Sequence, residues 1–499
     1  MQLHWFRSDL RIHDNTALHT AASHGAVIAV YLVTPQQWQQ HDDAPCKIDF
    51  WRRQLIELSH QLNCLNIPLL IRHCDTWQDV PSQLLALCQQ HGIEQLHCNA
   101  EYGFNERYRD AATRQLLQQH TIGFKRYLDQ LLFKPGSIRT QSDGYFQVFG
   151  QFKRVCQQRL YEQLSTILPA PQPQAKLSIQ ADAIADNLAE FTKYADGFDY
   201  AGAGNVNQTN VDHGHANQAS VELIAAQWAV GEAQAMQRLS DFCDAAILDY
   251  DQARDLPALA GVSQLSPYIN AGILSVRQCL HVAVSAANGE LFGANEGINT
   301  WITQLLWREF YQHILVGFPQ VSQHQPFKEK SKNLPWRHAP DDLLRWQYGQ
   351  TGFPIIDAAM RQMLQTGWMH NRLRMIVAMF LSKNLLIDWR LGEQWFMQHL
   401  IDGDLAANNG GWQWSASTGT DSVPYFRIFN PITQSQKIDP DGIFIRQWLP
   451  ELAHLDNKSI HAPYLSSKIG SLKLDYPAPM VDLADSRKRA LAAFAALRD

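Results

Sequence analysis

Short apolar or β-branched runs alternate with helical patterns near the start of the chain, and no other feature constrains the fold as much. The apolar runs are Leu3–Phe6, Ala26–Val33, Ile67–Cys74 and Glu94–Cys98, and the helical patterns cover residues 47–63, 77–90 and 105–118. Strands that alternate with helices form βαβ units, whose helices cover both faces of a parallel sheet. The turn after the first strand lacks the Gly-x-Gly-x-x-Gly dinucleotide fingerprint. The sequence therefore predicts an α/β domain over residues 1–132, with a Rossmann-like parallel sheet.

The composition changes after this domain. From Phe133 to Ala219 the periodic pattern weakens, and the segment contains a proline-rich run that begins at Pro169 and a Gly/Asn/Gln-rich run over 201–217. Such composition is typical of linkers, because it carries few side chains that could form a core. We therefore predict a connector over residues 133–220 that is partly of low order.

Helical patterns dominate from Val221 onward. The sharpest pattern is Thr300–Leu315, where polar and aromatic side chains recur at helical spacing on one face. These side chains are Gln304, Trp307, Arg308 and Tyr311. Pro354 suits the first turn of a following helix, and Gly367 suits its C-terminal end. The next helix is expected to begin at Trp368. The sequence predicts a larger all-α domain over residues 221–499.

The segment Asp402–Asp421 has the most unusual local composition. It holds two adjacent Asn, two adjacent Gly and two Trp close to a pair of carboxylates, Asp402 and Asp404. Asp, Asn and Gly favour turns, and a buried Trp needs a partner for its indole N–H. The pattern predicts a turn-rich backbone wrapped around a flat group. A structural loop pinned by buried Trp is the alternative.

The charge balance limits how the chain could contact nucleic acid. The formal net charge is -6 at pH 7, and residues 221–499 carry 24 Lys and Arg against 27 Asp and Glu. A protein that coats nucleic acid with positive charge is usually basic. Any contact with DNA must therefore come from a local patch.

Cysteine usage and hydropathy indicate the compartment. The 8 Cys form no Cys-x-x-Cys pair, so the sequence predicts neither a metal site nor a disulfide framework. No apolar run approaches the length of a membrane span, and the N-terminus shows no signal-peptide pattern. We expect a cytoplasmic protein without membrane contact.

Four segments together resemble the photolyase/cryptochrome family. They are residues 5–15, 301–311, 351–375 and 402–431, and the similarity extends over nearly the whole chain except the connector. Within the family, the chain is most similar to bacterial class I cyclobutane pyrimidine dimer photolyases. The resemblance implies an antenna-binding α/β domain, a long connector and a helical domain that encloses a U-shaped FAD.

The resemblance assigns FAD contacts by position. They are Tyr250, Val262, Ser263, Gln264, Leu265, Ser266, Trp301, Arg308, Asn371, Arg374, Asp402, Asp404 and Asn408. Arg374 would be the charge partner of Asp402, and Asn408 would face the flavin N5, where an amide can donate or accept a hydrogen bond. Residues 262–266 would hold the phosphates. The family usually has Thr at position 262 and Arg at position 264, so we expect weaker FAD binding here.

The resemblance also implies an electron relay and a lesion pocket. Trp412, Trp389 and Trp336 match the relay through which the family photoreduces its flavin. The matched DNA and lesion contacts are Arg254, Gln304, Trp307, Arg308, Tyr311, Asn371, Arg372, Met375, Trp414 and Gln434. Trp307 and Trp414 would be aromatic walls for the flipped dimer, since stacking is worth roughly 1–3 kcal/mol per base. Arg254 and Arg372 would contact phosphates.

Two positions refine the expected reaction, in which excited reduced FAD donates an electron that splits the dimer. Asn371, together with Met375, favours the cyclobutane lesion, because (6-4) photolyases carry His where Asn371 stands. Gln304 stands where class I photolyases carry Glu. Gln keeps a hydrogen-bond donor but supplies no proton. We therefore expect repair to persist with lower efficiency per photon.

An antenna site is implied in the α/β domain. His41, Asn105 and Glu106 match folate-binding positions, which favours 5,10-methenyltetrahydrofolate. Ser322 and Gln323 stand where similar proteins have Cys and Lys, so the glutamyl tail loses a partner. An empty or differently filled site is the alternative.

Two other functions remain open from the sequence. A photolyase-like cryptochrome would use the same flavin for blue-light signalling with weak or no repair. A Trp-rich module that binds polysaccharide or peptide would explain the aromatic residues but not the paired Asp. For the favoured repair enzyme, we expect single- or double-stranded UV-damaged DNA as partner, with nucleoid association when bound. We expect a monomer with no obligate protein partner.

Overall fold

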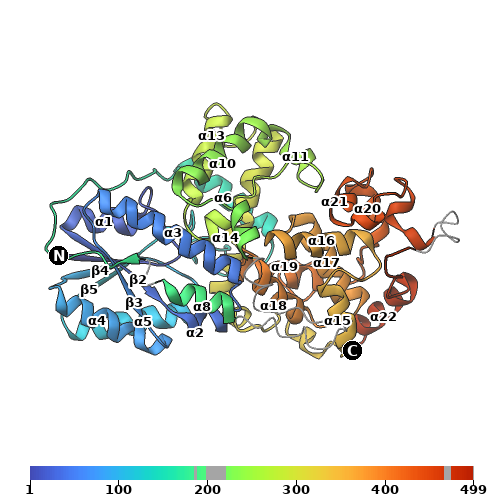
Figure 1. Cartoon of the computed structure of the whole chain (residues 1–499), viewed down its shortest axis with the longest axis horizontal. Helices are drawn as coiled ribbons and strands as arrows, with labels where there is room; N and C mark the ends of the chain where they lie inside the picture. Colours follow the sequence, from blue (N-terminus) through green and yellow to red (C-terminus); the bar gives the residue numbers. More distant parts are fainter. Residues whose placement is uncertain (185–187, 198–220, 466–473, 498–499) are drawn as a thin grey trace.

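The computed structural model describes residues 1–184, 188–197, 221–465 and 474–497. The Gly/Asn/Gln-rich run over 201–217, for which low order was expected, lies outside these residues. Figure 1 shows a sheet with its flanking helices at one end of the molecule and a larger helical part at the other. The predicted fold class, an α/β domain followed by an all-α domain, is confirmed.

The sheet has five parallel strands in the order β3-β2-β1-β4-β5. Their bounds are Gln2–Phe6 for β1, Val27–Val33 for β2, Leu69–His73 for β3, Gln95–Asn99 for β4 and Gly123–Tyr127 for β5. The sequence predicted the first four strands. It missed β5, because this edge strand is only partly buried and carries Lys125 and Arg126 instead of an apolar run.

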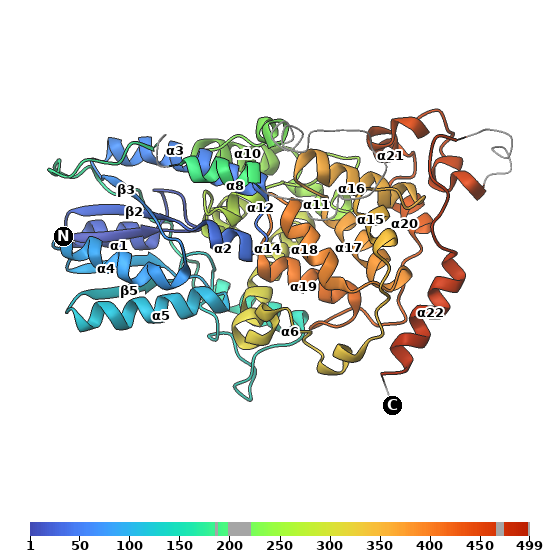
Figure 2. The same ribbon diagram turned by 60° about the horizontal axis from the view of Figure 1, so that its bottom comes forward.

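Helices cover both faces of the sheet. Figures 1 and 2 show α1 (Thr16–His24) and α3 (Pro45–Cys64) on one face and α4 (Val80–Gln90) and α5 (Phe104–Gln119) on the other. Successive strand side chains point to opposite faces. Accordingly, Val27 and Ala29 pack with α1 and α3, whereas Ile28 and Val30 pack with α4 and α5. The short helix α2 (Pro35–Gln40) follows β2.

The segment after Phe133 contains helices that the sequence did not predict. They are α6 (Phe149–Glu162) and α8 (Ala189–Gly197). The side chains of α6 at Phe149, Phe152, Cys156 and Leu160 are buried at helical spacing against α14 (Glu296–Gly317). The expectation that periodicity dissolves after Phe133 was wrong for α6, since tertiary contacts bury this narrow apolar stripe although the rest of the helix is polar.

The remaining helices form the all-α part. They are α10 (Glu232–Ala245), α11 (Tyr250–Ala253), α12 (Ser266–Asn270), α13 (Val276–Ala286), α15 (Pro340–Gln347), α16 (Pro354–Thr366), α17 (Asn371–Met379), α18 (Trp389–His399), α19 (Leu405–Ala416), α20 (Pro431–Ile438), α21 (Ile443–Trp448) and α22 (Leu483–Ala495). Pro354 opens α16 and Gly367 ends it in a left-handed conformation, as predicted. Helix α17 begins three residues later than expected, at Asn371. Of the helices described, none has the length and apolarity that a bilayer crossing requires.

The predicted turn-rich segment Asp402–Asp421 is mostly helical. Asp404 caps α19 by accepting a hydrogen bond from the Ala407 N–H at 2.7 Å, and Ser417 ends the helix in a left-handed conformation. Gly and Asn disfavour helix interiors, but tertiary packing routinely overrides propensity. Here the packing is supplied by buried Trp412 and by Asn409, whose amide donates to Glu393 Oε1 at 2.7 Å.

Buried charges join the two halves of the molecule. Arg277 of α13 lies 2.9 Å from both Asp14 Oδ2 and Asp129 Oδ1, and all three side chains are buried. Burial alone would raise the pKa of Asp129, but Arg11 and Arg277 lower it to about 2. Removing one partner of a buried ion pair lowers the stability of the folded protein by about 3–5 kcal/mol. This network fixes the sheet against the helices that carry the site.

Candidate functional site

Ten of the predicted site residues lie on partly exposed faces of α14, α17 and α19, and α14 and α17 each pack against α19. Helix α14 contributes Gln304, Trp307, Arg308 and Tyr311, helix α17 contributes Asn371, Arg372, Arg374 and Met375, and helix α19 contributes Asn408 and Trp414. Each set recurs at helical spacing, so its members share one side of their helix.

Helix α19 has one open side. Asn408, Gly411 and Trp414 are partly or fully exposed, whereas Trp412 and Gln413 on the opposite side are buried. A Cβ atom built on Gly411 would meet no atom within 4 Å. An interior helix of a folded protein rarely leaves such space unfilled, because interiors are close-packed. The open side of α19 therefore has room for a bound group.

A partly buried ion pair joins α17 to the turn before α19. Arg374 Nη2 is 2.8 Å from Asp402 Oδ2, and Ser266 Oγ donates to the same oxygen at 2.6 Å. The carbonyl of Gly403 accepts hydrogen bonds from Asn270 Nδ2 at 2.9 Å and from Lys47 Nζ at 2.6 Å. The structure thus brings together residues from α12, α17 and the turn before α19, and it adds Lys47 of α3, which sequence reasoning missed.

One hydrogen bond, from its own Nδ2, orients the side-chain amide of Asn408. Its Nδ2 donates to the Glu393 carbonyl at 3.0 Å, and no partner of its Oδ1 occurs among the residues that the structure describes. The side chain is partly exposed on the open side of α19. An amide oxygen has two acceptor lone pairs. Asn408 therefore offers an acceptor to a protonated nitrogen in that space.

The segment Val262–Ser266 lies directly before α12. Gln264 has the left-handed φ of 50°, and Ser263 Oγ is 3.5 Å from Trp301 Nε1. Phe242 links Trp301 to Tyr250, with ring centroids 5.5 and 5.8 Å apart respectively, and burial raises the pKa of Tyr250 to about 12. The predicted phosphate segment and the predicted residues Trp301 and Tyr250 therefore form one wall.

The three predicted relay tryptophans share one core. Trp412 and Trp389 are buried in it, and Trp336 packs at its edge and is partly exposed. Within the described part of the chain, no ring contact joins these three side chains directly. Trp412 instead contacts Phe396 at 5.0 Å and Trp346 at 5.9 Å. The three residues therefore range from fully buried, at Trp412 and Trp389, to partly exposed, at Trp336.

The predicted lesion wall Trp307 already has an aromatic partner. Phe149 of α6 stacks on it, with ring centroids 3.7 Å apart and planes inclined by 12°. The sequence analysis does not single out Phe149, because the composition of its segment predicts a connector. The apolar spacing of α6 is the signal that indicates a buried helix there. Gln304 Nε2 donates to the Thr300 carbonyl at 3.1 Å, and Trp414 stays partly exposed. Phe149 therefore fixes the plane of the Trp307 ring.

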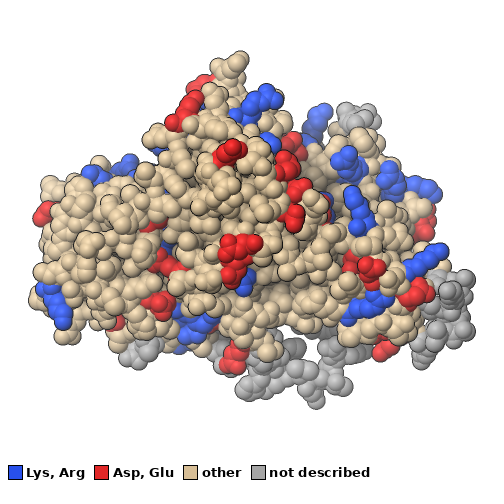
Figure 3. Space-filling model, turned by 90° about the horizontal axis from the view of Figure 1, so that it is seen from above, with Lys and Arg blue, Asp and Glu red and all other residues tan. Residues whose placement is uncertain are grey.

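The predicted phosphate contacts share an acidic neighbour. Arg372 Nε is 3.0 Å from Asp255 Oδ1, and Arg254 Nε is 3.7 Å from the same oxygen. Gln434 lies partly exposed on α20. Figure 3 shows Lys and Arg interspersed with Asp and Glu, with more basic groups over the C-terminal helices than over the sheet domain. The positive charge available to a polyanion is local.

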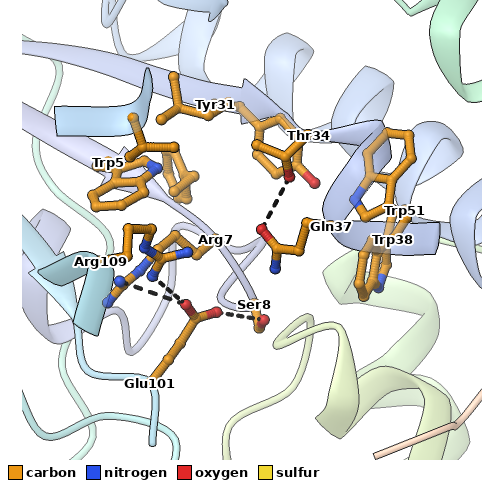
Figure 4. A pocket seen from close by; sticks show the side chains of 13 residues that line it. Trp5, Arg7, Ser8, Tyr31, Thr34, Gln37, Trp38, Trp51, Glu101 and Arg109 are labelled. Carbon is orange, nitrogen blue, oxygen red and sulfur yellow. Dashed lines mark hydrogen bonds and ion pairs between the residues drawn. The ribbon is translucent and has the colours of Figure 1, made fainter. Parts of the chain in front are cut away.

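The predicted antenna residues come together at the sheet domain. His41 Nδ1 is 3.8 Å from Glu106 Oε1, Asn105 Nδ2 is 3.4 Å from His41 Nε2, and burial raises the pKa of Glu106. A cavity near this cluster lies at the carboxyl ends of β1 and β2 (Figure 4). Glu101 lines this cavity, and its carboxylate accepts hydrogen bonds from Arg109 Nη2 at 2.7 Å and from Ser8 Oγ at 2.8 Å. Ligands of open α/β sheets bind at such strand ends.

Comparison with known families identifies the class. Residues 2–174 match the family model described as DNA photolyase, and residues 301–496 match the FAD binding domain of DNA photolyase. The deoxyribodipyrimidine photo-lyase of Salmonella typhimurium is 42% identical over 496 residues, which cover 99% of this chain and 98% of the relative. The chain belongs to the DNA photolyase family.

Solved structures agree with this assignment. A bacterial class III photolyase from Agrobacterium tumefaciens superposes with a TM-score of 0.83 at 32% identity, covering 100% of this chain and 97% of the other. A cryptochrome from Synechocystis sp. PCC6803 superposes with a TM-score of 0.82 at 29% identity, covering 99% of both chains. The fold is thus shared by photolyases and cryptochromes.

The residues present fit FAD. The donor set around the open side of α19 combines a guanidinium and carboxylate pair, a free amide oxygen and two serine hydroxyls at Ser263 and Ser266. A side-chain atom added at Gly411 would meet no other atom within 4 Å, so space is open beside this donor set. Arg308 lies on the neighbouring face of α14, where its Nη1 donates to the Gln130 carbonyl at 2.6 Å. This chemistry suits a polar cofactor with an aromatic ring.

Proposed function

We propose that this chain is a deoxyribodipyrimidine photo-lyase, which uses blue light to split cyclobutane pyrimidine dimers in DNA. The observation that carries the proposal is the convergence of α14, α17 and α19. Arg374 and Asn408, with Asp402 in the turn before α19, would hold the cofactor, and Trp307 of α14, which stacks on Phe149, would hold the base. A cofactor chamber and an aromatic base pocket on adjacent faces suit electron transfer to a flipped base.

The cofactor, FAD in its reduced form, would supply the photoexcited electron when bound. Arg374 and Asp402, which lie 2.8 Å apart, would orient its polar edge. Asn408 Oδ1 would accept a hydrogen bond from a protonated flavin nitrogen, because Asn408 Nδ2 already donates to the Glu393 carbonyl. Ser263, Ser266 and the backbone between them would hold the phosphates. Trp412, Trp389 and Trp336 would carry electrons from the surface to the chamber.

The lesion would be held by stacking and by polar contacts. Trp307 and Trp414 would bracket the dimer, and Phe149 would keep the plane of Trp307 fixed. Asn371, Met375 and Tyr311 would line the pocket beside them, with Gln304 donating from Nε2 to the pyrimidine. Extruding a base costs a few kcal/mol, least at a distorted lesion, and stacking offsets roughly 1–3 kcal/mol per base. Damaged sites would therefore be preferred.

The sheet domain would hold an antenna. We infer 5,10-methenyltetrahydrofolate at His41, Asn105 and Glu106, since these side chains already lie together. This rests on the division into an antenna domain at 1–132, a connector and a flavin domain at 221–499. We also infer that the protein is a cytoplasmic monomer. Its contacts with DNA would include Arg254, Arg372 and Gln434.

An absorption spectrum and a repair assay test the proposal together. Purified protein is expected to show a flavin band, and blue light is expected to remove thymine dimers from an irradiated oligonucleotide. A flavin band without light-dependent repair would favour a cryptochrome, and the absence of flavin would contradict the proposal. Incubation in the dark provides the control.

A further inference from the structure

We propose that Arg238 of α10 supplies the positive charge that binds the FAD diphosphate, acting beside Gln264 in the phosphate segment. The inference rests on the proposed FAD function and deepens it. From the sequence, weaker FAD binding was expected because Gln264 brings no charge to this segment. The structure places a guanidinium there from another helix, since Arg238 Nη1 donates to Gln264 Oε1 at 3.0 Å.

The Arg238 side chain is held in place by aromatic rings. Its guanidinium carbon lies 5.1 Å from the Trp228 ring centroid and 5.7 Å from that of Tyr268. Tyr268 is itself fixed, because its hydroxyl donates to the Ala229 carbonyl at 2.8 Å. Arginine stacks well on aromatic faces and keeps its in-plane N–H donors available. The guanidinium is therefore positioned before any ligand arrives.

Arg238 has no carboxylate partner among the residues that the structure describes. In the described ranges, no Asp or Glu oxygen forms an ion pair with it, whereas Arg374 and Arg372 each have a carboxylate partner. The side chain is only partly buried, and its hydrogen bonds within the described residues, to the side chains of Gln264 and Tyr268, use only part of its five donors. A guanidinium with unused parallel donors matches a phosphate group, which it can bind in a bidentate manner.

The contact partner Gln264 belongs to the predicted phosphate segment. Its left-handed backbone, at φ 50°, lies between Ser263, which contacts Trp301, and Ser266, which donates to Asp402. The segment thus has one side on the cofactor wall, while the Gln264 side chain reaches Arg238. The charge expected from position 264 is therefore present nearby on α10.

Titration of the flavin-free full chain with FAD and with riboflavin tests this assignment. Riboflavin lacks phosphates, so it reports ring binding alone. Arg238→Gln is expected to weaken FAD binding roughly tenfold or more, because a hydrogen bond to a charged group is lost. Riboflavin binding is expected to stay within about twofold of the original value. The charge swap Arg238→Gln with Gln264→Arg is expected to recover most of the FAD affinity.

Arg139→Gln is the matched control, since Arg139 also stacks on an aromatic ring, 4.0 Å from the Tyr145 centroid. It is expected to leave both affinities unchanged. Equal weakening of FAD and riboflavin by Arg238→Gln would assign Arg238 a purely structural role and overturn the proposal, as would unchanged FAD binding. Failure of the unaltered chain to bind FAD would instead contradict the proposed function.

Discussion

At the residue scale, Gln304 is one of the positions where the site departs from what the family resemblance leads us to expect, which is Glu. Gln304 Nε2 donates one N–H to the Thr300 carbonyl, which leaves the second N–H for a base. An amide cannot supply a proton as a carboxylic acid can. We expect Gln304→Glu to raise the number of dimers split per absorbed photon. Lesion affinity should change by no more than about 1 kcal/mol, the net value of one hydrogen bond. An unchanged quantum yield would refute this account of Gln304.

Trp307 tests the lesion pocket. Trp307→Ala should weaken binding of dimer-containing DNA by about 1–3 kcal/mol, because one stacking surface is lost. Trp307→Phe should retain much of the affinity, since Phe149 can still stack on the smaller ring. Binding of undamaged DNA, measured on the same oligonucleotide before irradiation, is the control. Equal losses for damaged and undamaged DNA would show that Trp307 does not contact the flipped base.

At the element scale, the start of α17 positions Asn371 and Arg372. His370 caps this helix, and its Nδ1 accepts the Arg372 N–H at 3.2 Å. His370→Ala should lower stability by about 0.5–2 kcal/mol, the usual value of an N-cap, whereas His370→Asn should retain the cap. The thermal unfolding midpoints of the three proteins provide the measurement. Equal midpoints for the original chain and the Ala variant would contradict the capping role.

The same residue gives a pH dependence with a defined sign. Burial lowers the pKa of His370 to about 4, below the ordinary value of 6.5. Because the folded state binds fewer protons, the stability that neutral His370 contributes is present above pH 6.5 and is lost as the pH falls toward 4. The difference in unfolding midpoint between the original chain and His370→Ala should therefore shrink at acidic pH. A difference that grows on acidification would reverse the assigned sign.

Elements with strong periodicity could be predicted, and elements fixed by tertiary contacts could not. Four strands, α14 and both ends of α16 follow from local patterns. Helix α19 could not be predicted, because its Asn and Gly residues disfavour helix and its stability depends on burial of Trp412 and Asn409. Likewise, the contacts of Phe149, Lys47 and Arg238 join segments far apart in sequence, so no local pattern reveals them.

At the scale of the whole molecule, the net charge of -6 predicts a weak salt dependence of DNA binding. Two phosphate contacts, from Arg254 and Arg372, give a slope of log K against log salt near -2 for B-DNA, about 0.9 per phosphate. Arg372→Gln should reduce the slope by about 1, and Arg114→Gln on the sheet domain should not change it. A slope steeper than about -6 would reveal a broad basic surface that this account lacks.

The central claim is that a flavin chamber and a lesion pocket on α14, α17 and α19 make this chain a light-driven repair enzyme. Its most direct test is the number of thymine dimers left in an irradiated oligonucleotide after blue light, with the bound flavin reduced and oxygen excluded. We expect dimers to disappear in proportion to absorbed light and to persist in the dark. Persistence of dimers under light, with reduced flavin and lesion both bound, would contradict the claim.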